Sequence, residues 1–138
     1  MSEQQNIDVV KKGYEAFGRG DIPGLLAQLD ANVSWVAFGP AELPTAGDRR
    51  GHQGVTEFFQ QLAAIVDITR FETKEFIAQG DRVVVIGEGT EKVKATGRAL
   101  EFHFAHVFSV RDGKVVSFVD YADVSAVVNE LRSARAQM

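Results

Sequence analysis

The sequence predicts an α+β domain in which a curved antiparallel sheet forms a cone and helices pack on its concave face. Helical spacing of apolar residues dominates the first half of the chain, and strand-like segments separated by tight turns fill residues 68–121. A final helical stripe follows the last of these strands. Helices followed by a run of strands are typical of α+β folds, and short turns make neighbouring strands antiparallel.

Length and composition indicate one globular domain. A chain of 138 residues can bury one sizeable core, so we expect a single domain over residues 1–138, with frayed tails at 1–5 and 133–138. The hydrophobic share of 45%, the charged share of 25% and a mean hydropathy of −0.08 are ordinary for such domains. The net charge of −4, with no cluster of Lys and Arg, predicts no nucleic-acid partner.

No membrane or secretion signal is expected. The N-terminal residues lack an apolar stretch, and nothing in the chain approaches the ~18 continuous apolar residues of a membrane span. We therefore expect no membrane partner and a cytoplasmic location. The absence of cysteine excludes disulfides, thiolate nucleophiles and cysteine-based metal sites.

The first half of the chain predicts two helices, a strand and a loop. Apolar residues at helical spacing indicate a helix over residues 6–17, and Asp21 is a suitable N-cap for a short second helix that includes Leu29. Residues 33–38 have strand composition. The Gly- and Pro-containing segment 39–53 predicts a long loop of the kind that often borders a site.

The second half predicts a third helix, four strands and a last helix. The strongest helical periodicity runs over residues 55–66 and requires a large apolar partner surface. Asp123 precedes the last helical stripe and is expected to cap it. The four strands span residues 68–79, 82–94, 98–110 and 114–121.

The last two strands carry a histidine and a carboxylate whose meeting depends on the turn between them. A two-residue turn at Asp112–Gly113 would leave His106 and Asp120 on opposite faces. A three-residue turn with a bulge at Gly113, which pairs Val110 with Lys114, would bring them to one face. We expect the bulge, because it places the Phe-rich face of the first strand on the same side of the sheet as Val116 and Phe118 of the second.

In the expected register His106 lies opposite Phe118 and diagonal to Asp120, within side-chain reach. An apolar pocket raises the pKa of a carboxyl group and a nearby imidazolium lowers it, so this pair could serve as a general base near neutral pH. The alternative is structural: His106 would be a satisfied core histidine, and Asp120 would join the strand end to the last helix.

Aromatic side chains are expected to line a pocket beside this pair. Trp35 is the strongest candidate, since a buried indole N–H requires a partner and the long loop follows its strand. No metal site is expected, because His103 and His106 face opposite ways on a strand and His52 is isolated. The candidate ligand-binding residues are Tyr14, Trp35, Phe38, Phe59, Phe104 and Phe118.

Four segments are informative because of their order and spacing along the chain. They are Tyr14–Asp21, Arg50–Phe59, His106–Lys114 and Asp120–Asp123. Together they resemble the NTF2-like superfamily, in particular its SnoaL-like branch of polyketide cyclases and ketosteroid-isomerase-related proteins. The resemblance implies the cone-shaped, cystatin-like α+β barrel, a deep apolar cavity and a homodimer formed through the outer surface of the sheet. It implies no single activity, because the fold carries isomerases, cyclases, hydrolases, dehydratases and binding proteins.

The resemblance also excludes some chemistry. The general base of ketosteroid isomerases falls on Ala37, their oxyanion-hole tyrosine on Gly13 and their second acid near Ala105, so steroid isomerisation by that route is not expected. Asp120 falls where SnoaL-like cyclases and related epoxide hydrolases place their acting carboxylate. The Arg-x-Asp pair of the hydrolases is missing from residues 87–91.

We therefore expect a cofactor-independent acid–base enzyme of isomerase, cyclase or hydrolase type that acts on a small apolar molecule. Asp120 would be the general base, with His106 as its partner or as an electrophilic donor. The alternative is a non-catalytic ligand-binding or accessory protein of the same fold. A homodimer would cover the convex face of the sheet, for which the candidate residues are Val83, Val85, Val107, Val115 and Val119.

Overall fold

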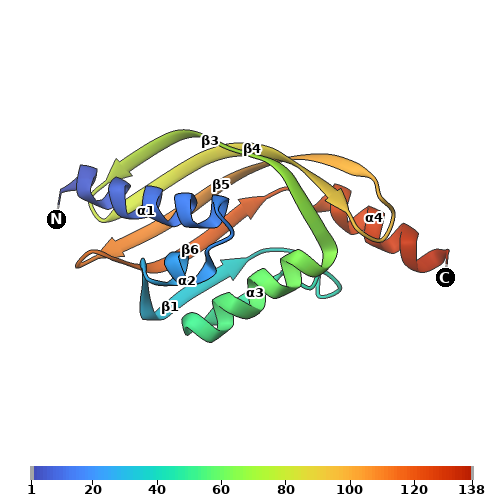
Figure 1. The fold of residues 1–138 in the computed structure, drawn as a ribbon, viewed down its shortest axis with the longest axis horizontal. Coiled ribbons are helices and arrows are strands. Elements are labelled where there is room, and N and C mark those ends of the chain that lie inside the picture. The colour runs from blue at the N-terminus through green and yellow to red at the C-terminus, as the bar shows by residue number, and fades with distance from the viewer. Residues whose placement is uncertain (1, 138) are drawn as a thin grey trace.

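A computed structural model describes residues 2–137, which form four helices and six strands. Figure 1 shows a strongly curved sheet with α1, α2 and α3 under its concave side and α4 at one end. The elements are α1 (Glu3–Gly18), α2 (Ile22–Leu26), β1 (Leu29–Ala37), β2 (Gly47–Arg50), α3 (Gly51–Ile65), β3 (Val66–Gln79), β4 (Arg82–Val93), β5 (Ala99–Arg111), β6 (Lys114–Ala122) and α4 (Ser125–Ala136).

The six strands form one sheet in the order β2-β1-β6-β5-β4-β3. Neighbouring strands are antiparallel except β1 and β6, which run parallel. The sheet is curved but open, with β2 and β3 as its edges. The predicted fold class, an α+β domain with a curved sheet and helices on its concave face, is confirmed.

Both terminal helices extend further than their sequence patterns indicate. Ser2 caps α1 through a capping box with Gln5, and this pairing holds the first turn at Glu3. At the other end α4 continues to Ala136. The tails predicted at 1–5 and 133–138 are therefore helical over residues 3–5 and 133–136, Ser2 and Gln137 are the cap residues, and Met1 and Met138 lie outside the described residues.

Other boundaries differ from the prediction near the first strand. Leu29 belongs to β1 and not to the second helix. Residues 47–50, predicted as loop, form β2 and pair with residues 34–37 of β1. Their sequence, Gly-Asp-Arg-Arg, lacks strand composition, and the strand forms because the free edge of β1 offers backbone hydrogen-bonding groups that need partners. Asp123 lies one residue before the N-cap of α4, where its carboxylate accepts hydrogen bonds from Ser125.

The turn between β5 and β6 is the two-residue type, which corrects the expected three-residue turn. Asp112 and Gly113 both have positive φ, at 51° and 78°, and the flanking pair is Arg111 with Lys114. Two positive φ values define the type I′ turn, whose twist matches a hairpin, and Asp-Gly is a preferred sequence for it. The expected bulge at Gly113 is therefore wrong.

A bulge does occur, three residues further along β6. Val110 pairs with Val115 and Ser109 pairs with Ser117, so Val116 has no partner. The extra residue reverses the alternation beyond it. His106 consequently pairs directly with Asp120, a closer relationship than the expected diagonal one.

Gly87 and Gly89 leave the inner surface of β4 without side chains at the places where aromatic rings lie on it. Phe104 pairs with Gly87, and Phe102 pairs with Gly89. A Cβ at Gly87 would collide with the Phe104 ring and with the backbone carbonyl of Glu72, so this position excludes any side chain. The glycines thus allow the rings to form the floor of the concave face.

Replacing Gly87 by alanine is expected to destabilise the fold. The new methyl group meets a backbone atom as well as a ring, and overpacking of this kind lowers the free energy of unfolding by about 2–3 kcal/mol. Urea titration measures the change. Gly18→Ala is the matched control, because nothing lies within 4 Å of the added Cβ and alanine favours the helix. Equal stability of the two variants would contradict this account.

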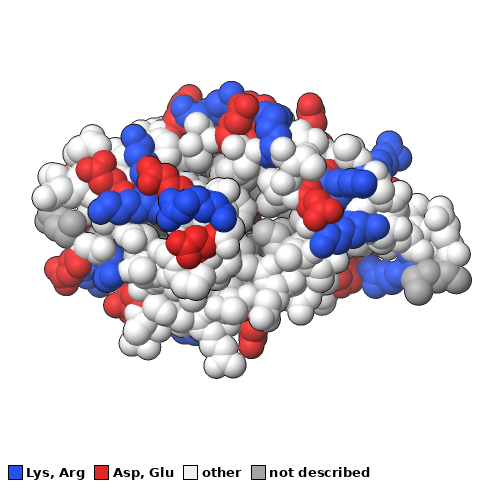
Figure 2. Space-filling model, in the orientation of Figure 1, with Lys and Arg blue, Asp and Glu red and all other residues white. Residues whose placement is uncertain are grey.

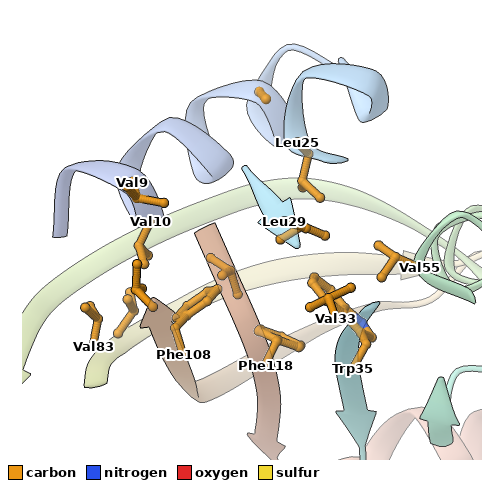
Figure 3. Packing of buried hydrophobic residues seen from close by; sticks show 14 of the residues in the cluster. Val9, Val10, Leu25, Leu29, Val33, Trp35, Val55, Val83, Phe108 and Phe118 are labelled. Carbon is orange, nitrogen blue, oxygen red and sulfur yellow. The ribbon is translucent and has the colours of Figure 1, made fainter. Parts of the chain in front are cut away.

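Two groups of buried apolar residues hold the layers together. The larger lies between the helices and the sheet and includes Val10, Val33, Trp35 and Phe118, as Figure 3 illustrates for part of it. The smaller surrounds Leu43 and attaches the loop before β2 and helix α4 to the end of the sheet. The concave face is therefore covered along its length.

The outer face of the sheet carries a row of aliphatic side chains, because directly paired residues share a face. The row crosses five strands through Ile77, Val84, Val107, Val119 and Val36. Of the expected convex-face residues, Val107 and Val119 lie here.

Three of the valines predicted on the convex face are buried inside. Val83 and Val85 are fully buried beneath the helices, and Val115 is 2% exposed. The unbroken Val-Val-Val-Ile sequence of β4 offers no alternation from which a face could be assigned. Val115 faces inward because the two-residue turn pairs it with the buried Val110.

Charged side chains of both signs mix on the face seen in Figure 2, over α1 and along the edge formed by β3 and β4. On the latter, Arg70 and Lys74 form ion pairs with Glu72 and Glu88. No helix within residues 2–137 is long and apolar enough to cross a membrane.

Candidate functional site

An internal cavity lies between the helices and the concave face of the sheet. Its volume is about 150 Å³, and its walls are almost entirely apolar. Tyr14, His106 and Asp120 are the titratable groups in the wall. Around them stand Val9, Val10, Gly13, Phe17, Leu25, Gln28, Leu29, Trp35, Phe58, Phe59, Leu62, Ile68, Phe71, Phe102, Phe104, Phe108, Val115, Phe118 and Ala122.

These three titratable groups form a chain of polar contacts. The Tyr14 hydroxyl lies 2.7 Å from His106 Nδ1, and His106 Nε2 lies 3.3 Å from Asp120 Oδ1. Tyr14 reaches the histidine from the apolar stripe of α1, while His106 and Asp120 are a direct cross-strand pair of β5 and β6. The structure therefore brings together the two residues that the sequence singled out and adds Tyr14 as a third.

Burial decides which group carries which proton. Burial, and secondarily the negative charge of Asp120, raise the pKa of Tyr14 well above its ordinary value of 10.0. Tyr14 thus keeps its proton at neutral pH, and its hydroxyl donates a hydrogen bond to His106 Nδ1. A neutral His106 then carries its own hydrogen on Nε2, the nitrogen that faces Asp120.

The Asp120 carboxylate is incompletely satisfied. Its Oδ1 is buried and makes no hydrogen bond, because the 3.3 Å approach of His106 Nε2 lacks hydrogen-bond alignment. The side chain as a whole is 24% exposed, so its accessible surface lies on its other atoms, Oδ2 among them. One oxygen therefore faces the histidine, and the remainder of the carboxylate stays open to a ligand.

Trp35 holds a second unsatisfied polar group. The side chain is 4% exposed and stacks on Phe118 with 3.9 Å between ring centroids, and its Nε1 has no hydrogen-bond partner within the described chain. Figure 3 shows Trp35 next to Phe118 in the buried core. Trp35 therefore differs from the phenylalanines of the cavity wall, because it buries a polar N–H that has no partner among residues 2–137.

The other candidate ligand-binding aromatics divide into two groups. Tyr14, Trp35, Phe59, Phe104 and Phe118 line the cavity as the sequence predicted. Phe38 does not line it. Its side chain is 54% exposed and packs against Tyr121 on the outer face of the sheet. The prediction failed at Phe38 because this residue lies beyond the end of β1, where a strand alternation no longer assigns a face.

Glu91 is a carboxylate that sequence reasoning missed. It pairs with Ile68 on β3 and Leu100 on β5, and its carboxylate makes no hydrogen bond or ion pair with any residue among 2–137. Burial raises its pKa, and the charge of Asp120 raises it further. Alternation from Val83 along β4 through the two glycines would have placed Glu91 on the inner face.

The shifted pKa of Glu91 predicts a pH-dependent effect of Glu91→Gln. A folded-state pKa above the ordinary 4.5 means that the neutral acid stabilises the fold below about pH 4.5 and that this contribution is lost as pH rises through the folded pKa. We therefore expect Glu91→Gln to be more stable than the wild type at about pH 7, with the difference shrinking towards about pH 4.

Urea titration at several pH values measures this trend. Glu101→Gln, at an exposed carboxylate of β5, is the matched control for loss of one negative charge. A stability difference between Glu91→Gln and wild type that does not change with pH would contradict the assignment.

The remaining histidines do not join the site. His52 contacts the Leu29 carbonyl at 3.0 Å, and His103 is exposed on the outer face of β5. Within residues 2–137, no three His, Cys, Asp or Glu side chains form a group that could hold a metal ion.

Known proteins match this chain over most of its length. A family model of the SnoaL-like domain matches residues 10–118. An uncharacterized protein of Mycobacterium tuberculosis is 27% identical over 127 residues, which cover 91% of this chain and 95% of that protein.

Two solved structures add to this result. An NTF2-like protein from Burkholderia xenovorans LB400 is 40% identical with a TM-score of 0.83, and the match covers 94% of this chain and 97% of that one. The protein TerC, co-crystallized with polyporic acid, is 33% identical with a TM-score of 0.80, over 91% of this chain and 96% of that one. The resemblance to the NTF2-like superfamily is confirmed.

Proposed function

The chain belongs to the SnoaL-like domain family, and from this premise we propose that it is a cofactor-independent acid–base enzyme acting on a small, largely apolar molecule. Asp120 is the general base, and the reaction is an isomerisation, a cyclisation or a hydrolysis. The cytoplasm is the compartment in which we propose that it acts, and cell fractionation would test that location.

One observation carries this proposal: a carboxylate with an unpaired oxygen stands in an apolar cavity, supported by a histidine and a tyrosine. Asp120 accepts a proton from the substrate, or from the attacking water in a hydrolysis, and becomes a carboxylic acid, then gives the proton to another substrate atom or to the leaving group. No electron acceptor or metal is needed for this sequence, because the proton balance closes within the site. His106, fixed by Tyr14, holds Nε2 at 3.3 Å from the carboxylate and supports it by this polar contact.

The relatives support the same kind of ligand. TerC, which is 33% identical, was co-crystallized with polyporic acid, an organic compound. The cavity walls here are aromatic and aliphatic, which favours a planar, mainly apolar molecule with one or two polar atoms.

Proton exchange in D₂O tests the proposal without knowledge of the natural substrate. Small aromatic ketones such as phenylacetone carry C–H groups next to a carbonyl, and a general base in the cavity would accelerate their exchange with deuterium. We expect the wild-type protein to catalyse this exchange after dialysis against a chelator, and Asp120→Asn to lose it. Binding of the ketones without any exchange would support the alternative of a non-catalytic binding protein.

We also propose that two copies associate through the outer face of the sheet. Ile77, which belongs to the aliphatic row, is 49% exposed, and beside the row lie Ile86, Tyr121 and Phe38, which are 39%, 51% and 54% exposed. An apolar surface of this kind is usually covered by a partner, and a two-fold axis lets identical patches cover each other.

Ile86→Lys is expected to shift this dimer to monomer, because the new charges would face each other in a dry interface. Analytical ultracentrifugation measures the change. Glu15→Lys, at an exposed position of α1, introduces the same side chain on the helical layer and should leave the dimer intact. A wild-type protein that is monomeric at micromolar concentration would contradict the proposal.

A further inference from the structure

We propose that Gly13 determines which molecules the cavity accepts. The side chain that this residue lacks leaves a recess in the part of the wall formed by α1, and a short alkyl group on the substrate ring fills that recess. The inference rests on the proposed function only in taking the cavity as the substrate site. It adds to that function a residue that determines specificity and a ligand class, a single ring with a short alkyl group.

Gly13 lies at the centre of the inward face of α1. Consecutive residues of an α-helix are rotated by about 100°, so Val9 and Phe17 flank the direction of Gly13 at about 40° on either side. Both residues line the cavity, as Gly13 itself does. Val9 is 9% exposed, and Phe17 packs against the rings of Phe59 and Phe71. A side chain at position 13 would therefore point into the space between the helix and the sheet.

The space in front of Gly13 is open. Apart from the adjoining residues and the helix backbone, no heavy atom of residues 2–137 lies within 4 Å of the Cβ that a larger residue would place there. Gly13 has intermediate exposure, although Val10 and Ala16 on either side of the same face are only 2% and 1% exposed. Accessible surface at the centre of a covered face belongs to the cavity, so Gly13 opens onto it.

The fold gives no reason for a glycine at this position. Gly13 lies in the interior of α1, and its φ is not among the positive values that favour glycine. In contrast to Gly87, it has no ring or backbone atom pressed against it. Glycine in a helix interior lowers the folding equilibrium constant roughly fivefold relative to alanine. The chain therefore carries a residue that lowers its stability at a place where the cavity gains room.

The recess is large enough to change which molecules fit. The cavity volume of about 150 Å³ is that of apolar cavities that bind benzene. A methyl group is about as large as a water molecule, so alanine at position 13 would remove room for roughly one water. A benzene ring can move away from one wall of the cavity. A ring with an alkyl group already fills the cavity, so it would collide with the new methyl group.

The surroundings of the recess favour an alkyl group over a polar one. The flanking side chains, Val9 and Phe17, are apolar, and the backbone groups of Gly13 are bonded within the helix. The hydroxyl of the next residue, Tyr14, is already hydrogen-bonded to His106. A substituent with an N–H or O–H group would lose its hydrogen bonds to water on entering such a place. We therefore assign the recess to a methyl or ethyl group.

Binding of benzene and ethylbenzene, measured by calorimetry, tests the proposal. We expect the wild-type protein to bind ethylbenzene about tenfold more tightly, because two more carbon atoms are buried. Gly13→Ala should weaken ethylbenzene binding about tenfold and change benzene binding less than about threefold. Gly18→Ala is the matched control, because it adds the same methyl group to an exposed position of the same helix outside the cavity wall. It should bind both probes as the wild type does.

Urea titration of the same variants shows whether Gly13 is structural. Both alanine variants should unfold at a higher urea concentration than the wild type, because alanine is the better helix former. If Gly13→Ala is less stable than the wild type or does not fold, the fold requires this glycine and the inference is wrong.

The binding data can also overturn the inference. It is wrong if Gly13→Ala binds both probes with wild-type affinity, if it loses affinity for both equally, or if the wild type binds neither at millimolar concentration. Failure of the proposed function looks different. In that case Gly13→Ala still changes the selectivity between benzene and ethylbenzene, but the wild-type protein does not catalyse proton exchange of ketones in D₂O.

Discussion

Asp120→Asn is expected to lower turnover by roughly 10²–10⁴-fold, the range that a positioned general base contributes. Asparagine keeps the size and the hydrogen-bond acceptor of the aspartate, but it cannot take up a proton at neutral pH. Because Oδ1 is buried without a hydrogen bond, its replacement by an amide removes an unfavourable buried charge. Stability should therefore stay near that of the wild type or rise.

The control is Asp123→Asn. Asp123 is three residues further along, fully exposed, and bonded to Ser125 in a way that asparagine reproduces. Deuterium exchange or product formation measures turnover, and urea titration measures stability for both variants. If Asp120→Asn unfolds the protein, or keeps full turnover, the carboxylate is structural and the enzyme proposal is wrong.

The fold could be predicted from the sequence because its signals are local and redundant. The spacing of Val55, Phe58 and Leu62 indicates α3 without any knowledge of its partner, and each tight turn separates two strands. Element β2 shows the limit of this reasoning. Its residues carry no strand signal, because the strand exists through pairing with β1 and not through its own composition.

The sequence singled out His106 and Asp120, which the structure brings together, but not the geometry that joins them. Asp112–Gly113 has the sequence of a two-residue turn, and such a turn alone would have separated His106 from Asp120. The bulge at Val116 restores their common face, and nothing in the run Val115-Val116 marks which residue is extra. Register is a property of two strands together, so one strand's sequence does not determine it.

Residues outside the expected motif show the same limit. No local motif marks Glu91, because its face follows only from alternation along the whole of β4. Tyr14 was expected as a wall of the pocket. Its contact with His106 brings together residues 92 positions apart, and only the packing of α1 on β5 produces it.

His106→Phe is expected to lower turnover by roughly 10–100-fold, because the polar contact of Nε2 with the Asp120 carboxylate at 3.3 Å is lost. The ring itself would be tolerated: His106 already lies against Phe104 and Phe118, with centroid distances of 4.0 and 4.8 Å. The substitution leaves the Tyr14 hydroxyl buried without its partner, which lowers the free energy of unfolding by about 1–3 kcal/mol.

Adding Tyr14→Phe to His106→Phe separates catalysis from structure. With both partners apolar, no buried group of that pair is left unsatisfied, so stability should recover while turnover stays low. Tyr14→Phe alone removes one neutral hydrogen bond from a histidine that still faces Asp120, and we expect a loss of turnover of only about tenfold. If His106 were merely a satisfied core histidine, turnover would follow stability through all three variants. A double variant that regains stability without regaining turnover is the result that only an orienting role produces.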